Sequence, residues 1–107
     1  MNPGTISGFD WDAGNTDKNN KHGVTSADAE EVFFREPLVA SDPDHSQKEP
    51  RLHALARIGD GRTLHVTFTL REIAGETLIR VISARPASRK ERLIYETAKA
   101  QSAKVQD

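Results

Sequence analysis

The stretch ETLIRVISARPASRKERLIY, residues 76–95, determines how the chain is organised. Residues 78–82 are apolar apart from one arginine and predict a strand. A short break is expected over residues 83–86, and a basic helix follows it. Ser88 and Glu91 fit a capping box, in which the Ser88 hydroxyl accepts from the backbone N–H of Glu91 and the carboxylate reaches back. The stretch therefore predicts a strand, a break and a capped helix, in that order.

Two further strands are predicted directly before this stretch. Residues 52–58 and 63–70 alternate apolar and polar side chains, and glycines stand at residues 59, 61 and 75, where turns are expected. Short connections favour antiparallel pairing of neighbouring strands. The three strands therefore predict an antiparallel meander that ends in the basic helix.

Two helices are predicted before the meander. Asp12 is a suitable N-cap for a polar helix that ends near Lys21, and Thr25 begins a second helix with Asp28 at the capping-box position. Residues 9–11 can form a short strand ahead of them. The expected fold is thus α+β, a small antiparallel sheet with two helices before the meander and one after it. These helices are expected to cover the apolar face of the sheet.

Length and composition predict one small domain. We expect it to span residues 9–101, with a flexible N-terminal extension at residues 1–8 and a flexible tail at residues 102–107. The absence of cysteine excludes disulfides and thiolate metal sites. No apolar run has the length of a membrane span, so we expect no membrane association and a cytoplasmic location.

Charge is divided unevenly along the chain. Residues 1–50 contain four Lys and Arg residues against ten Asp and Glu residues, whereas residues 51–107 contain eleven against six. A polyanion such as RNA would therefore bind the second half. One face of the predicted sheet is polar there and carries His65, Thr67, Thr69, Arg71, Arg57 and Arg80. An ordinary solvated face of an antiparallel sheet is the other interpretation of this pattern.

Several fragments of the chain, taken in order, resemble a known family. They are FDWD at residues 9–12, NKHGV at 20–24, AEEVF at 29–33, DHS at 44–46, RTLHVTFT at 62–69 and IRVISAR at 79–85, followed by Glu91 and Tyr95. In this order and at these intervals they resemble the BrnT toxins of bacterial type II toxin–antitoxin systems. The resemblance covers residues 9–96, which is nearly the whole chain.

The resemblance implies a RelE-like fold and an endoribonuclease toxin that arrests translation by cleaving RNA. It also implies a cognate antitoxin with a ribbon-helix-helix DNA-binding domain. That partner would neutralise the toxin in a complex that we expect to hold two toxins and an antitoxin dimer. Operator DNA would be contacted only through the antitoxin.

Metal-independent RNA cleavage needs cations for the phosphate and groups that move protons. The 2′-hydroxyl attacks its own phosphate, a base takes its proton, and an acid protonates the leaving 5′-oxygen. Arginine suits the phosphate because its planar fork binds two oxygens at once. Arg80 and Arg85 are the first candidates for this role, and Arg71 is expected to support them.

Proton transfer is assigned, as a hypothesis, to His22 or Glu91 as the base, with Tyr95 orienting the substrate. Glu91 and Tyr95 are four residues apart and share one helix face. Each also has a structural interpretation: Glu91 as a cap, Tyr95 as a core residue and His22 as a cation at a helix end. Further RNA-binding cations are expected at Lys21, Arg57, Arg71, Arg89 and Arg92.

Other histidines and acids support weaker hypotheses. His53 and His65 lie on different predicted strands and could be neighbours, although their spacing does not fix this. The loop at residues 42–45, DPDH, contains ligand types that bind metals, but its spacing favours a turn, and we expect no metal or cofactor. A non-catalytic RNA- or ribosome-binding module using the same arginines is the alternative function. A protein that acts only by complex formation is a third.

Overall fold

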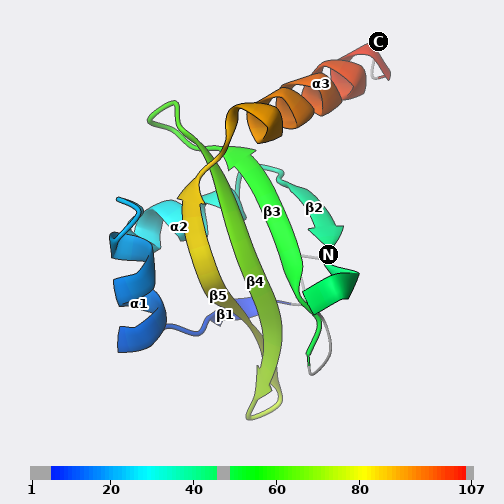
Figure 1. The fold of residues 1–107 in the computed structure, drawn as a ribbon. Helices are drawn as coiled ribbons and strands as arrows, with labels where there is room; N and C mark the ends of the chain where they lie inside the picture. Colours follow the sequence, from blue (N-terminus) through cyan, green and yellow to red (C-terminus); the bar gives the residue numbers. More distant parts are fainter. Residues whose placement is uncertain (1–5, 46–48, 106–107) are drawn as a thin grey trace.

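The computed structural model describes residues 6–45 and 49–105 of the chain (Figure 1). It is an α+β fold. Its elements in chain order are β1 (Ile6–Phe9), α1 (Ala13–Asn20), α2 (Ser26–Val32), β2 (Leu38–Ser41), the 3-10 helix η2 (Pro43–His45), β3 (Leu52–Arg57), β4 (Thr63–Ile73), β5 (Glu76–Pro86) and α3 (Arg89–Val105). Among the described helices, none combines the length and the apolar composition needed to cross a membrane.

The strands form one five-stranded sheet in the order β1-β5-β4-β3-β2. β3, β4 and β5 make the predicted antiparallel meander, and β2 adds antiparallel to β3. β1 pairs with β5 in parallel, so the sheet is mixed and the purely antiparallel prediction is wrong. Two helices rather than a hairpin turn follow β1, so no short connection fixes its direction.

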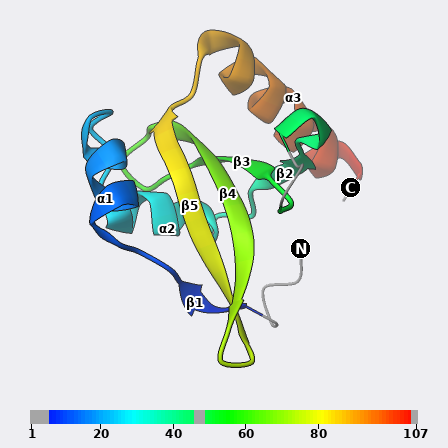
Figure 2. The same ribbon diagram turned by 60° about the horizontal axis from the view of Figure 1, so that its bottom comes forward.

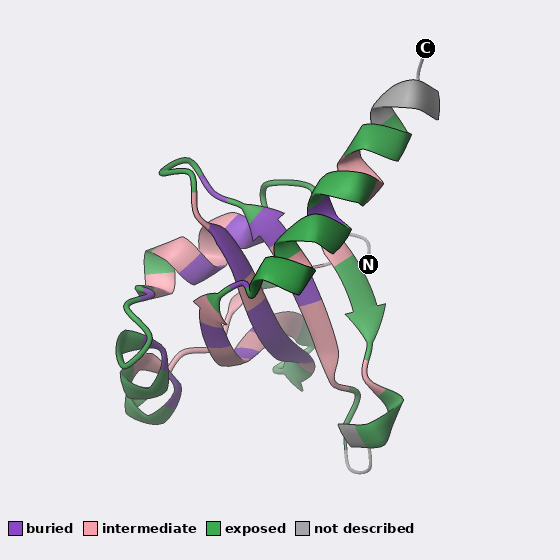
Figure 3. Cartoon of the chain, turned by 45° about the horizontal axis from the view of Figure 1, so that its top comes forward, coloured by how far each residue is buried: buried purple, intermediate pink, exposed green. Residues whose placement is uncertain are grey.

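Helices lie on both faces of the sheet. α2 covers the apolar face, where Phe33 meets Phe68 edge to face at 4.9 Å between ring centroids. α3 lies on the opposite, polar side of the sheet (Figures 2 and 3), and its Tyr95 ring is buried. The expectation that all helices cover the apolar face is therefore wrong for α3. The polar face can hold a helix because Tyr95 provides a large apolar surface there.

The polar face is not simply solvated where α3 and the neighbouring loop approach it. Thr63, Thr67 and Thr69 of β4 are all buried. Figure 3 shows α3 passing in front of strands that are largely buried. The Thr69 hydroxyl donates to the carbonyl of Pro50, in the loop that precedes β3. This part of the polar face is therefore partly enclosed.

α1 has a composition poor for a helix, yet it is anchored to the sheet by two buried amides. Asn15 donates from Nδ2 to the carbonyl of Val81 at 3.0 Å. Asn19 accepts at Oδ1 from the N–H of Ala84 at 2.9 Å. These amides satisfy backbone groups of β5 beyond the point where β1 ends. They therefore fix the last part of β5, which leads into α3.

β5 is longer than the sequence predicts. The expected break at residues 83–86 is strand, and Pro86 is paired with Leu64 of β4. Proline is tolerated there because the strand ends at this residue. α3 likewise continues to Val105, beyond the expected end at Gln101. Arg85 consequently lies on a strand, where its register and its direction are both set.

Candidate active site

The end of β5, the start of α3 and the middle of β4 meet at one place on the polar face. Arg85 of β5 is the register partner of His65 on β4. Two residues after β5 the chain turns at Ser88 into α3, whose first turn contains Glu91. The predicted capping box is confirmed: Glu91 N–H donates to Ser88 Oγ at 3.2 Å, and Ser88 N–H donates to Glu91 Oε1 at 2.8 Å.

Arg85 and Glu91 form a two-pronged ion pair. Arg85 Nη1 donates to Glu91 Oε1 at 2.8 Å, and Nη2 donates to Oε2 at 2.9 Å. These hydrogen bonds from Arg85 are the main reason that the pKa of Glu91 falls to about 2, and the same contact raises the pKa of Arg85. Both groups are therefore ionised at neutral pH. The Arg85 side chain remains 40% exposed, so a phosphate can reach the same fork.

His65 completes this group. Its Nε2 lies 3.8 Å from Glu91 Oε2, and only 12% of its side chain is exposed. Burial lowers the pKa of His65 below the ordinary 6.5, and the Glu91 carboxylate opposes that shift. The ring is therefore mostly neutral at pH 7. Its Nδ1 is buried without a hydrogen-bond partner among the described residues. An N–H on Nε2, facing the carboxylate, is consequently the favoured tautomer.

A second histidine stands next to His65. The rings of His53 on β3 and His65 are 4.8 Å apart between centroids, with 39° between their planes. His53 contacts Asp42 Oδ2 through Nε2 at 2.9 Å and Thr67 Oγ1 through Nδ1 at 3.0 Å. Strand alternation places both histidines on one face. The possibility that they are neighbours is thus confirmed, which the sequence alone left open because it did not give the register.

The other candidates for catalysis are distributed over the fold. Arg80 contacts Asp12 at 2.8 Å and Asp10 at 3.4 Å, so it ties β5 to the segment between β1 and α1. Arg80 and Arg85 therefore belong to different ion pairs, Arg80 in the middle of β5 and Arg85 near its end. His22 is exposed in the turn after α1. The Tyr95 ring is buried, with Lys99 Nζ 5.6 Å from its centroid.

The sequence predicts five RNA-binding cations, and the structure places them in different settings: Lys21, Arg57, Arg71, Arg89 and Arg92. Arg57 pairs with Glu96 at 2.9 Å, and Arg71 lies 3.5 Å from Glu49. Arg92 donates to the carbonyl of Ala87. Lys21 and Arg89 are exposed. Arg89 and Arg92 lie on the same helix as Glu91, close in sequence to the Arg85 pair.

Within the described ranges, no group of three His, Cys, Asp or Glu side chains could hold a metal ion. In the DPDH loop, Asp42 Oδ2 lies 2.9 Å from Nε2 of His53. The side chain of His45 lies outside the described part of the chain.

Comparison with known proteins provides the family. No curated protein matches the chain. Residues 11–91 match the family described as the ribonuclease toxin, BrnT, of type II toxin-antitoxin systems. The match starts at Trp11, before α1, and ends at Glu91, so it includes His65, Arg85 and the capping box of α3. An antitoxin partner and an RNA substrate follow from that family description. The chain therefore belongs to the BrnT family of ribonuclease toxins of type II toxin–antitoxin systems.

Proposed function

We propose that the chain is a metal-independent endoribonuclease in which Arg85, Glu91 and His65 surround the scissile phosphate. The observation that carries the proposal is the two-pronged Arg85–Glu91 pair with His65 Nε2 at 3.8 Å from the same carboxylate. A phosphate fork, a carboxylate and an imidazole are the groups needed for attack by a 2′-hydroxyl. All three come from fixed positions on β4, β5 and the capped start of α3.

The reaction is an intramolecular transfer at phosphorus. Glu91 takes the proton of the 2′-hydroxyl, the 2′-oxygen bonds to phosphorus, and the bond to the 5′-oxygen breaks. His65 gives a proton to that leaving oxygen, so the products end in a 2′,3′-cyclic phosphate and a 5′-hydroxyl. Arg85 binds the non-bridging oxygens, whose negative charge grows in the transition state.

Phosphate binding raises the pKa of both proton-transfer groups, Glu91 and His65, which is the direction that this reaction needs. Arg85 is the main cause of the low pKa of Glu91, and a phosphate that shares its guanidinium weakens that effect. The phosphate charge also raises the pKa of the nearby carboxyl, so Glu91 becomes a stronger base. The same charge raises the pKa of His65, as Glu91 already does, and favours the imidazolium that acts as the acid.

The remaining candidates have supporting roles in this proposal. Arg80 holds β5 through Asp10 and Asp12, and Tyr95 anchors α3 to the sheet. His22 is exposed after α1 and is not placed at the reacting atoms. Arg89 and Arg92 flank Glu91 on α3 and contact the RNA backbone on either side of the cut. Lys21, Arg57 and Arg71 extend the cationic surface that binds RNA.

The cellular role follows from the family. We propose that cleavage arrests translation in the cytoplasm, and that a ribbon-helix-helix antitoxin neutralises the toxin in a complex of two toxins with an antitoxin dimer. Contact with operator DNA then occurs through the antitoxin. The RelE-like classification of the fold is part of the same proposal, supported by the meander followed by a helix.

The test uses purified protein and a defined RNA in EDTA. We expect cleavage with cyclic-phosphate ends, and loss of cleavage in an Arg85→Ala variant that keeps its circular-dichroism spectrum. RNA binding without any cleavage would contradict the proposal and favour the non-catalytic RNA-binding module, which would use the same arginines. Cleavage that appears only after a divalent metal is added would contradict metal independence.

A further inference from the structure

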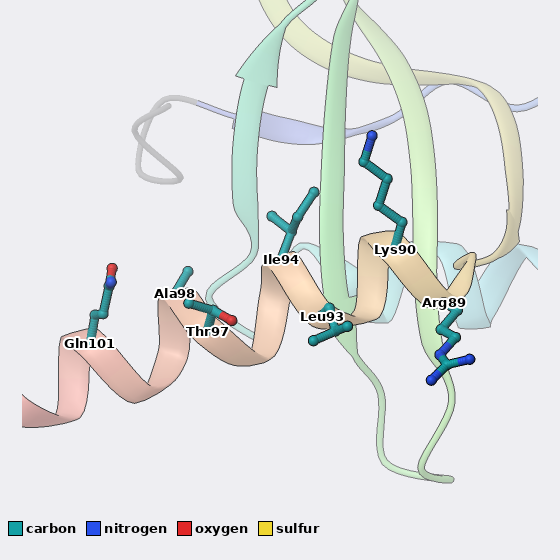
Figure 4. A pocket seen from close by; sticks show the side chains of 7 residues that line it. All are labelled: Arg89, Lys90, Leu93, Ile94, Thr97, Ala98 and Gln101. Atoms are coloured by element: carbon teal, nitrogen blue, oxygen red, sulfur yellow. The ribbon is translucent and has the colours of Figure 1, made fainter.

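The outward face of α3 carries a stripe of exposed and partly exposed side chains. Its members recur every three to four residues along the helix and are Arg89, Lys90, Leu93, Ile94, Thr97 and Ala98 (Figure 4). Neighbours four residues apart lie one above the other on a helix, so Arg89 is in line with Leu93, and Lys90 with Ile94. We call this set the outer stripe. The opposite side of α3 contains Glu91 and Tyr95, which face the sheet.

Two large apolar side chains of the outer stripe are exposed to water. Leu93 is 55% exposed and Ile94 is 50% exposed, and they are adjacent in sequence. In Figure 4 the Ile94 and Lys90 side chains project to one side of the helix, and those of Leu93 and Arg89 to the other. The two apolar side chains thus lie on either side of the outward face of the helix. The apolar face of an amphipathic helix can bury exposed side chains of this kind.

The two cations of the outer stripe indicate that the partner covering it is negatively charged at this end. Arg85, Arg80 and Arg57 each pair with a carboxylate of this chain. By contrast, Arg89 and Lys90 have no ion-pair partner within residues 6–45 and 49–105, and both are exposed. Two neighbouring cations beside two apolar anchors are complementary to a segment that has carboxylates at one end and apolar side chains along it.

The outer stripe also begins at the candidate active site. Arg89 and Lys90 directly precede Glu91, which is bonded to Arg85. A segment whose carboxylates bind Arg89 and Lys90 therefore sits at the edge of the phosphate site. Its negative charge repels RNA from Arg85, and its bulk closes the approach along α3.

We infer that the antitoxin neutralises this toxin by laying an acidic amphipathic helix along the outer stripe, with its apolar side chains over Leu93 and Ile94 and its carboxylates at Arg89 and Lys90. The inference rests on the proposed function, because it takes the toxin's partner to be its inhibitor. A helix packed along another helix fits its side chains between rows of residues four apart, and the outer stripe presents two such rows.

The test compares two sets of variants by calorimetric titration with the purified ribbon-helix-helix protein encoded beside the toxin gene. The double variant Leu93→Gln/Ile94→Gln removes the apolar anchors without adding charge, and glutamine keeps the helix propensity. Ile73→Gln is the matched control, because Ile73 is 47% exposed at the end of β4, in the distant β4–β5 hairpin. Cleavage of RNA by each variant without antitoxin is measured in parallel.

We expect the double variant to bind the antitoxin on the order of 100-fold more weakly, and the control to bind like the wild type. The double variant should cleave RNA at the wild-type rate and escape inhibition. Wild-type affinity in the double variant would overturn the inference, and so would a toxin dimer that the double substitution dissociates in light scattering. A wild-type toxin that does not cleave RNA would refute the ribonuclease proposal instead, while the affinity comparison would still test the docking surface.

Discussion

The Arg85→Lys substitution keeps a positive charge at the phosphate site and removes the fork. In the wild-type structure, Arg85 donates two parallel hydrogen bonds to Glu91, at 2.8 and 2.9 Å. A phosphate bound by two oxygens needs the same geometry. A lysine ammonium is a point charge and cannot bind two oxygens in one plane. If the fork stabilises the phosphorane, charge alone will not replace it.

The expected loss of cleavage rate can be estimated from other enzymes in which a group that stabilises transition-state charge is removed. Removal of one such group lowers the rate by about 10²–10³-fold, or about 3–4 kcal/mol of transition-state stabilisation. Stability should fall by less than about 1 kcal/mol, because the pair is partly exposed. Arg35→Lys is the matched control, since Arg35 pairs with Glu31 at 2.8 Å on α2, on the other face of the sheet.

The assay is single-turnover cleavage of a short RNA in EDTA, with thermal unfolding of each variant recorded alongside. Arg85→Lys should lose about 10²–10³-fold in rate with a melting temperature close to that of the wild type. Arg35→Lys should be unchanged in rate. Equal rates for wild type and Arg85→Lys would refute the proposed role of the Arg85 fork, since they would show that any cation at this position suffices.

Three further predictions follow from the same contacts. Replacing His65 by glutamine removes the proton donor, so cleavage should fall by about 10²–10⁴-fold; an unchanged pH–rate profile would exclude His65 as the acid. Glu91 has its pKa lowered from 4.5 to about 2, so its ion pair stabilises the fold above pH 4.5 and loses that effect as the pH falls towards 2. The contribution is about 1–2 kcal/mol after solvent screening, and urea unfolding of Glu91→Gln should be less sensitive to acid over that range; equal acid sensitivity in both proteins would argue against it. Arg80→Ala should lower the melting temperature, because Asp10 and Asp12 lose their partner, and leave cleavage per folded molecule within about threefold; selective loss of cleavage would instead place Arg80 at the phosphate.

Local patterns in the sequence predicted local structure well. The capping boxes at Thr25 and Ser88 are formed as their spacing indicates, because each involves residues only three apart. The alternation in residues 63–70 placed His65 and Thr67 on one face of β4. Predictions of this kind depend on short-range geometry, which a single sequence contains.

Contacts between elements that are far apart in the chain are harder to predict from the sequence. The break expected at residues 83–86 is strand, because buried Asn19 of α1 and the pairing with β4 hold β5 in place there. His65 meets Glu91 because α3 crosses the polar face, and helix periodicity does not say which face a helix will cover. The cap spacing predicts the position of Glu91 in α3, whereas its contact with His65 depends on how α3 packs on the sheet.

The proposed mechanism requires an RNA 2′-hydroxyl to attack its own phosphate at the Arg85–Glu91–His65 site without a metal. The most direct measurement uses an RNA with a single 2′-deoxy nucleotide on the 5′ side of the mapped cleavage site, incubated with the toxin in EDTA. We predict that this linkage stays intact while the all-ribose RNA is cut there to a cyclic phosphate. Cleavage of the 2′-deoxy linkage would contradict the mechanism, since no internal nucleophile would remain.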